Sequence, residues 1–364
     1  MNGYQRISAA LRGEKTDKVP VMLHNFMMAA REHGVTMEQY RNDPKMIAEC
    51  FIASVEKYKF DGILVDIDTV TLAGAVGVPV DFPADDPART HIGNLENLED
   101  LVNLKPPKVE DYKYIQIWLE AVRLLKEYYK DEIYIRGNCD QAPFSLASMM
   151  RGAQNWMLDL MMGSDEQLQS ILEYCTDATS QFIKLMAQTG CDMVSNGDSP
   201  AGPEMISPEM YVQYALPYEK IIVKAAHDAG LTYALHICGN TDVILEHMLL
   251  TGADAFELDY KTDISKIYNT IRNTTTLIGN IDPSGVLALG TVGSVREKTL
   301  ELLTAYQHSN RFILNAGCAI PPVTPSENLK MMIDTARNFR LDMYFYCWLT
   351  LKGNQNENLP FCFL

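Results

Sequence analysis

One histidine and two cysteines have the residue types of a metal site. His236 and Cys238 are two positions apart in LHICGNT, and Cys318 follows 80 positions after Cys238 in NAGC. Residues two apart at a strand end can point the same way. One imidazole and two thiolates form a three-ligand Zn²⁺ set whose fourth position is open to a substrate. A thiol bound there is deprotonated and stays nucleophilic. The alternative is a buried histidine beside two small apolar cysteines.

Eight short apolar runs could bring these residues together, because each has the β-branched or apolar character of a strand buried on both faces. They are residues 19–24, 62–66, 132–137, 191–195, 231–236, 253–258, 275–280 and 311–316. Helical apolar patterns alternate with them at 44–58, 114–129, 165–188, 207–229, 241–250, 263–272, 292–308 and 326–339. This count predicts an α/β fold, a single (β/α)₈ TIM barrel. A doubly wound sheet is the alternative, but no G-x-G-x-x-G follows any run.

The active site of such a barrel lies at the C-terminal ends of its strands. Polar groups end all eight runs, and several are carboxylates. Some of them, Asp140 and Asp282 above all, have helix capping as an equal alternative. The strand-end residues are His24, Asn25, Asp66, Asp68, Asn138, Asp140, Asn196, Asp198, His236, Cys238, Glu257, Asp259, Asn280, Asp282, Asn315 and Cys318.

Two segments fall outside the alternation of strands and helices. Residues 69–111 contain five prolines and are expected to form a loop that covers the barrel mouth. Residues 340–364 are aromatic and show no clear helical pattern. We therefore assign residues 1–339 to the barrel and 340–364 to a C-terminal tail of unknown role.

The composition excludes several classes of protein. A formal net charge of −16 over 364 residues argues against nucleic acid as a partner and against a basic membrane-binding patch. Neither a signal-peptide pattern nor an 18-residue apolar run occurs, so we expect a cytoplasmic protein without a membrane span. The eight cysteines are then expected to be thiols or metal ligands rather than a disulfide framework.

Five segments resemble the uroporphyrinogen decarboxylase superfamily, and the resemblance extends over residues 4–339. It implies a single (β/α)₈ barrel, in agreement with the strand count. The segments are RISAALRGEKTDKVPV (6–21), FDGILVDID (60–68), LHICGNT (235–241), GNIDPSGVL (279–287) and NAGCAIPPVTPSEN (315–328).

The decarboxylase branch of this superfamily fits poorly. Its arginine-bearing R-Q-A-G-R motif corresponds to HNFMMAA at 24–30, which has no arginine. Its tyrosine after the third strand matches Met149, and its final histidine matches Cys318. Asp68 is retained. Because a polycarboxylate porphyrinogen needs cationic partners, decarboxylation is the alternative and not the main expectation.

The zinc-dependent corrinoid methyltransferases, similar to methylcobamide:coenzyme M methyltransferases, fit better. Their H-x-C motif is followed 75–80 residues later by A-G-C, as in this chain. The resemblance implies Zn²⁺ on His236, Cys238 and Cys318. It also implies methyl transfer from a corrinoid such as methylcobalamin, carried on a partner protein, to a small thiol such as coenzyme M. A homodimer is an open expectation, and a non-catalytic corrinoid- or thiol-binding protein is a further alternative.

Strand-end position gives the remaining site residues their expected roles. Asp68, Asp198 and Glu257 are candidate acids, supporting groups or a temporary fourth metal ligand, and Asn196 and Asn280 are expected to orient the substrate. Met149 is assigned to substrate binding as well.

Overall fold

The computed structural model describes residues 1–339, and the tail assigned to 340–364 lies outside them. Eight parallel strands form one sheet in the order β1-β2-β5-β6-β7-β8-β9-β10. A parallel bridge between Val21 and Leu314 brings the two edges together and closes the ring. The predicted (β/α)₈ barrel is therefore confirmed. The strands are β1 Met22–Leu23, β2 Gly62–Val65, β5 Tyr134–Gln141, β6 Met193–Gly197, β7 Thr232–Ile237, β8 Ala255–Leu258, β9 Thr276–Ile281 and β10 Phe312–Ala316.

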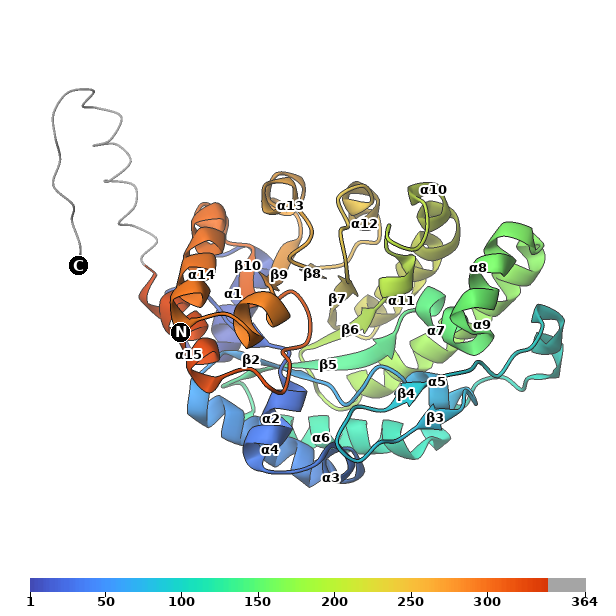
Figure 1. Ribbon diagram of the computed structural model, residues 1–364, viewed down its shortest axis with the longest axis horizontal. Helices are drawn as coiled ribbons and strands as arrows, with labels where there is room; N and C mark the ends of the chain where they lie inside the picture. The colour runs from blue at the N-terminus through green and yellow to red at the C-terminus, as the bar shows by residue number, and fades with distance from the viewer. Residues whose placement is uncertain (340–364) are drawn as a thin grey trace, which may run out of the picture.

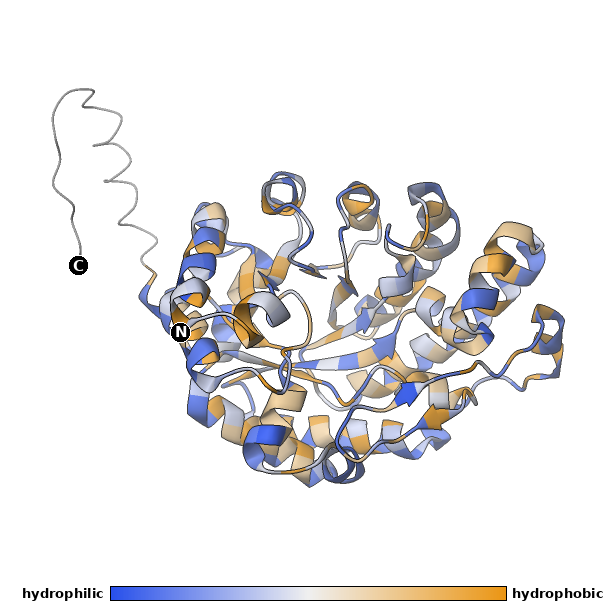
Figure 2. Cartoon of the chain, in the orientation of Figure 1, coloured by the Kyte–Doolittle hydropathy of each residue, from blue (hydrophilic) through white to orange (hydrophobic). Residues whose placement is uncertain are grey.

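Helices surround the strands (Figure 1), and each predicted helical pattern contains one of them. Their capping follows the sequence: Asp43 accepts a hydrogen bond from the backbone N–H of Lys45, beside Pro44 in the first turn. Most carry hydrophobic and hydrophilic residues together (Figure 2), as expected of helices packed on a sheet. These helices are α4 Pro44–Tyr58, α6 Lys113–Tyr129, α9 Asp165–Ala187, α11 Leu216–Asp228, α12 Leu245–Leu249, α13 Ile264–Ile271, α14 Val292–Tyr306 and α15 Ser326–Asn338.

Other elements depart from the sequence expectation. The helix expected over 207–229 is broken into α10 (Pro208–Met210), a π-helical turn at Tyr211–Ala215 and α11, because Pro217 lacks an N–H for regular helical bonding. The segment 69–111 is not only loop: it contains α5 (Thr71–Ala75) and a small antiparallel pair, β3 (Val80–Asp81) and β4 (Arg89–Thr90). Helices that we did not predict are α1 Gly3–Arg12, α2 Phe26–His33, α3 Met37–Asn42, α7 Pro143–Arg151 and α8 Ala153–Met162.

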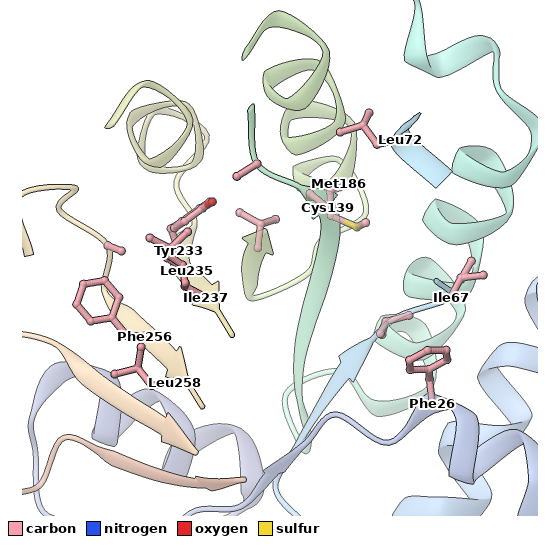
Figure 3. Packing of buried hydrophobic residues seen from close by; sticks show 14 of the residues in the cluster. Phe26, Ile67, Leu72, Cys139, Met186, Tyr233, Leu235, Ile237, Phe256 and Leu258 are labelled. Carbon is pink, nitrogen blue, oxygen red and sulfur yellow. The ribbon is translucent and has the colours of Figure 1, made fainter. Parts of the chain in front are cut away.

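Strand alternation decides which side chains enter the barrel. Leu235 and Ile237 of β7, with Phe256 and Leu258 of β8, pack into the layer between strands and helices (Figure 3). Side chains one residue away point the opposite way. His236 of β7 therefore projects into the barrel interior, beside its register partner Glu257 of β8.

Helix α1 closes the N-terminal end of the barrel. Ile7, Ala10 and Leu11 pack there against inward side chains of the strands, among them Met193 and Ile278. This apolar plug lies at the end of the barrel that serves stability, opposite the strand ends expected to carry chemistry. Among residues 1–339, no helix is long and apolar enough to cross a membrane.

Replacing the fully buried Ile7 by alanine is expected to destabilise the protein by about 2–5 kcal/mol, because the lost side chain leaves a cavity in this plug. Denaturant unfolding measures the loss, and Ser8→Ala on the same helix is the control. Zinc affinity of the folded variant should match that of the parent protein. A reduced zinc affinity would contradict the separation of the two barrel ends.

Candidate metal centre

The structure brings His236, Cys238 and Cys318 together at the C-terminal ends of β7 and β10. The Nε2 of His236 lies 3.0 Å from the Sγ of Cys238, which lies 3.6 Å from the Sγ of Cys318. One ligand atom from each residue falls within 4.8 Å of the other two, and both cysteines are free thiols. Within the described part of the chain, this cluster has the donor types and spacing to hold a metal ion.

The donor set fits Zn²⁺. Two sulfurs bound to a tetrahedral zinc at about 2.3 Å would lie about 3.8 Å apart, close to the separation found here. The Nδ1 of His236 lies 3.0 Å from the backbone carbonyl of Glu257, so this ring nitrogen donates and Nε2 faces the sulfurs. Hydrogen bonding of the second ring nitrogen is the usual way in which a protein orients a metal-binding histidine.

The three side chains of the cluster shift one another's pKa values. A hydrogen bond donated by Cys318 lowers the pKa of Cys238 to about 3, with His236 acting in the same direction. The same bond raises the pKa of Cys318. Burial alone would lower the pKa of His236, but Cys238 outweighs burial and raises it to about 9. A bound metal ion would replace the proton shared by the two sulfurs and the proton on Nε2 of His236, because metal ligands must be deprotonated.

Glu257 links the candidate metal cluster to other polar side chains inside the barrel. Its Oε2 lies 2.6 Å from the Nη2 of Arg136, and its Oε1 lies 3.5 Å from the Nδ1 of His24 and accepts a hydrogen bond from Asn315. Burial would raise the pKa of Glu257, but Arg136 and the neighbouring histidines outweigh it and hold the pKa well below its usual range. Glu257 is therefore ionised near neutral pH and is not placed to act as an acid there.

A cavity of about 270 Å³ lies next to the cluster at the C-terminal ends of the strands. Thr69 and Pro87, from the segment expected to cover the mouth, contribute to its wall. Six of the nine predicted site residues line this cavity: Asp68, Asn196, His236, Cys238, Glu257 and Cys318. The side chain of Asn196 is already used, since it donates to the Cys139 carbonyl and accepts from the Tyr233 hydroxyl. It is thus bound to the barrel wall rather than free to orient a substrate.

The other three predicted residues lie apart from the described lining of this cavity. Asp198 is fully buried behind it, accepts hydrogen bonds from Ser145 and adjoins Glu219; burial raises its pKa to about 6. Asn280 lines a different cavity of about 560 Å³ and donates to the Asp259 carbonyl. Met149 packs against the hydrophobic core. Strand-end position alone did not distinguish residues inside the barrel from those behind it.

Two residues with a clear place in the cavity had no assigned role. His24 donates from Nε2 to Asp66 over 2.7 Å; burial would lower its pKa, but Asp66 and Glu257 raise it to about 9. Arg136 is 1% exposed and lines the cavity. A signal was present for Arg136, because it is a charged residue within a buried strand and shares the inward-facing register of Tyr134 and Asn138.

Fold and site together define a (β/α)₈ barrel with a candidate metal centre at the active-site end. The chain belongs to the uroporphyrinogen decarboxylase (URO-D) family, whose profile matches residues 3–339. This membership confirms the resemblance drawn from the five sequence segments.

Relatives of the chain include two kinds of enzyme. "Methylcobamide:CoM methyltransferase MtbA" of Methanosarcina acetivorans is 30% identical over 342 residues, 92% of this chain and 98% of that relative. A uroporphyrinogen decarboxylase of Prochlorococcus marinus is 28% identical over 90% of this chain and 95% of its own length. A solved methyltransferase from Methanosarcina mazei shares the fold, with a TM-score of 0.84, 22% identity and coverage of 95% and 99% of the two chains.

Proposed function

We propose that this protein transfers a methyl group from a methylated corrinoid, carried on a partner protein, to the sulfur of a small thiol. His236, Cys238 and Cys318 would hold Zn²⁺ as the cofactor. The observation that carries the proposal is the convergence of these three side chains beside the cavity. Relatives named methylcobamide:CoM methyltransferases support a reaction of this kind, with coenzyme M as one candidate acceptor.

The reaction requires a thiolate in contact with the methyl group. The thiol loses its proton to solvent, and its sulfur attacks the methyl carbon. The C–S bond forms as the Co–C bond breaks, and the electron pair of that bond stays on cobalt, which changes from Co(III) to Co(I). Bound Zn²⁺ would supply the acidity that makes the thiol a thiolate near neutral pH.

The residues of this chain would position the reactants. His236 is held in place by the Glu257 carbonyl, and Glu257 is held by Arg136 and Asn315. This chain of contacts fixes one side of the cavity, so an acceptor sulfur enters a prearranged site. Asp68 is the carboxylate that we retain as a contact of the acceptor, since it lines the cavity and Asp198 does not.

Decarboxylation of a porphyrinogen is less well supported, although decarboxylases are among the relatives. Such a substrate carries several carboxylates, which need cationic partners. Outside the metal cluster, the described lining of the cavity contains two cationic side chains, Arg136 and His24, and each already contacts a carboxylate, so they are too few for such a substrate. The methyl transfer reaction is therefore the better match to the donor set of the site.

The proposal is tested with zinc-loaded protein, methylcobalamin and a thiol. We expect the absorbance of methylcob(III)alamin to be lost and an S-methyl product to appear by mass spectrometry, and both should stop when zinc is removed by a chelator. Full activity without zinc would contradict the assigned cofactor. Release of CO₂ from a porphyrinogen, with no S-methyl product from any thiol, would instead identify the decarboxylase.

A further inference from the structure

Two charged side chains from neighbouring strands present unpaired atoms to the cavity. Arg136 lies on β5, in register with Leu64 of β2, and Asp68 follows the end of β2. Arg136 and Asp68 are each 1% exposed, and both line the cavity that adjoins the metal cluster. A ligand in this cavity can therefore reach a cationic and an anionic group.

Arg136 has more donors than partners. Its Nη2 contacts Glu257 over 2.6 Å, but Nε and Nη1 have no hydrogen-bond partner among residues 1–339. Buried donors are normally satisfied, and a ligand in the cavity with an acceptor group would satisfy these two. A carboxylate or sulfonate is the natural partner, because charge-assisted hydrogen bonds to a guanidinium are strong.

Only one of the two carboxylate oxygens of Asp68 accepts hydrogen bonds from the described residues. Its Oδ1 accepts from the backbone N–H groups of Val70 and Thr71 and from the Thr71 hydroxyl, at 2.8–2.9 Å, which fixes the start of α5. Its Oδ2 is buried and has no partner in the described chain. Burial, partly offset by those hydrogen bonds, raises the pKa of Asp68 to about 6, so a cation beside Oδ2 would relieve the cost of its charge.

The charge balance of the cavity favours a ligand with both signs of charge. Two cations already contact two carboxylates, in the pairs Arg136–Glu257 and His24–Asp66. Both oxygens of Asp140 accept hydrogen bonds, from the backbone N–H of Leu72 and from the Gln141 amide, and burial raises its pKa well above the usual value. Asp68 is thus a surplus carboxylate, and a purely anionic thiol would lie beside it without compensation. An ammonium group on the ligand would provide that compensation.

We propose that the methyl acceptor is a zwitterionic amino-acid thiol, with its acid group on Arg136, its ammonium group on Asp68 and its sulfur at the metal cluster. This inference rests on the proposed thiol methyl transfer and adds the class of acceptor. It also makes Arg136 and Asp68 residues that determine specificity.

Calorimetric titration of the zinc-loaded protein with matched thiols tests this inference. Homocysteine carries an ammonium and a carboxylate group, 4-mercaptobutyrate lacks the amine, and 3-aminopropanethiol lacks the acid. The fourth thiol, 2-mercaptoethanesulfonate, carries a sulfonate and no amine. We expect homocysteine to bind about 10-fold more tightly than each of the others, since each lost charge-assisted hydrogen bond has roughly that effect or more.

Two conservative variants separate the two contacts. Asp68→Asn keeps an Oδ1 acceptor for α5 and should weaken homocysteine and 3-aminopropanethiol about 10-fold, while 4-mercaptobutyrate is unchanged. Arg136→Lys keeps a charge for Glu257 and should weaken homocysteine and 4-mercaptobutyrate, while 3-aminopropanethiol is unchanged. A merely structural role would change all thiols equally.

The outcomes distinguish this inference from the proposed function. If 4-mercaptobutyrate or 2-mercaptoethanesulfonate binds as tightly as homocysteine, the zwitterionic acceptor is wrong and thiol methyl transfer stands. Equal losses for all thiols in either variant would also overturn the inference. Failure of every thiol to bind the zinc-loaded protein would instead contradict the proposed function itself.

Discussion

Replacing Cys318 by serine is expected to reduce zinc affinity by at least about 10-fold and to abolish thiol methylation. The hydroxyl group is a weak zinc ligand and stays protonated where a thiol would not. Loss even of groups that support a metal ligand reduces metal affinity by about 10–100-fold, so loss of a ligand should do no less. The sulfur of Cys238, 3.6 Å away, would be left with His236 alone. Zinc affinity is measured by competition with a chromogenic chelator, and methylation by mass spectrometry.

Cys50→Ala is the matched control, because Cys50 is a buried free thiol on α4, away from the described cavity lining. This variant should retain zinc and methyl transfer. If the Cys318 variant also kept the zinc affinity of the parent protein while folded, Cys318 would not be a ligand.

The second large effect is expected for Glu257→Gln. This change leaves the buried Arg136 without the carboxylate that lies 2.6 Å from it. It also removes the negative charge 3.5 Å from the Nδ1 of His24. Removing one partner of a buried ion pair costs about 3–5 kcal/mol of unfolding free energy. Denaturant unfolding at neutral pH should show a loss of this size.

The contribution of Glu257 depends on pH in a defined direction. Its pKa in the folded state lies below the value of about 4.3 expected for an unfolded chain. The stabilisation is therefore present above that value and is lost as the pH falls toward the folded pKa.

Glu301→Gln is the control for this second prediction. Glu301 pairs with Lys298 over 2.7 Å, but both side chains are more than half exposed. Exposed pairs contribute about 0–1 kcal/mol, so the control should lose no more than that. Equal losses in the two variants would contradict the structural role assigned to Glu257.

The barrel could be predicted from sequence because its signals are local. Each buried strand contains an apolar run, and several major helices begin at a recognisable cap such as Asp43-Pro44. Helix α1 gave a weaker signal, since its apolar residues contact strand residues distant in sequence, such as Met193 and Ile278. The small β3–β4 pair is too short for any periodicity to show in the sequence.

The convergence of His236, Cys238 and Cys318 could be predicted for a different reason. His236 and Cys238 form a motif, and the end of another barrel strand supplies Cys318. The ion pair between Arg136 and Glu257 could not be predicted in the same way, because the two residues come from strands that are not neighbours in the sheet. Asn280 shows that a position at a strand end does not by itself place a residue in the site. Its amide donates to the Asp259 carbonyl, beside another cavity.

X-ray absorption spectroscopy of the zinc-loaded protein tests whether both cysteines and the acceptor thiol bind the same zinc ion. We expect two sulfur neighbours and at least one imidazole nitrogen around zinc, and a third sulfur neighbour after addition of the acceptor thiol. Cys318→Ser should remove one sulfur from both spectra. A zinc ion surrounded only by nitrogen and oxygen, or one whose sulfur count does not change when thiol is added, would contradict the account.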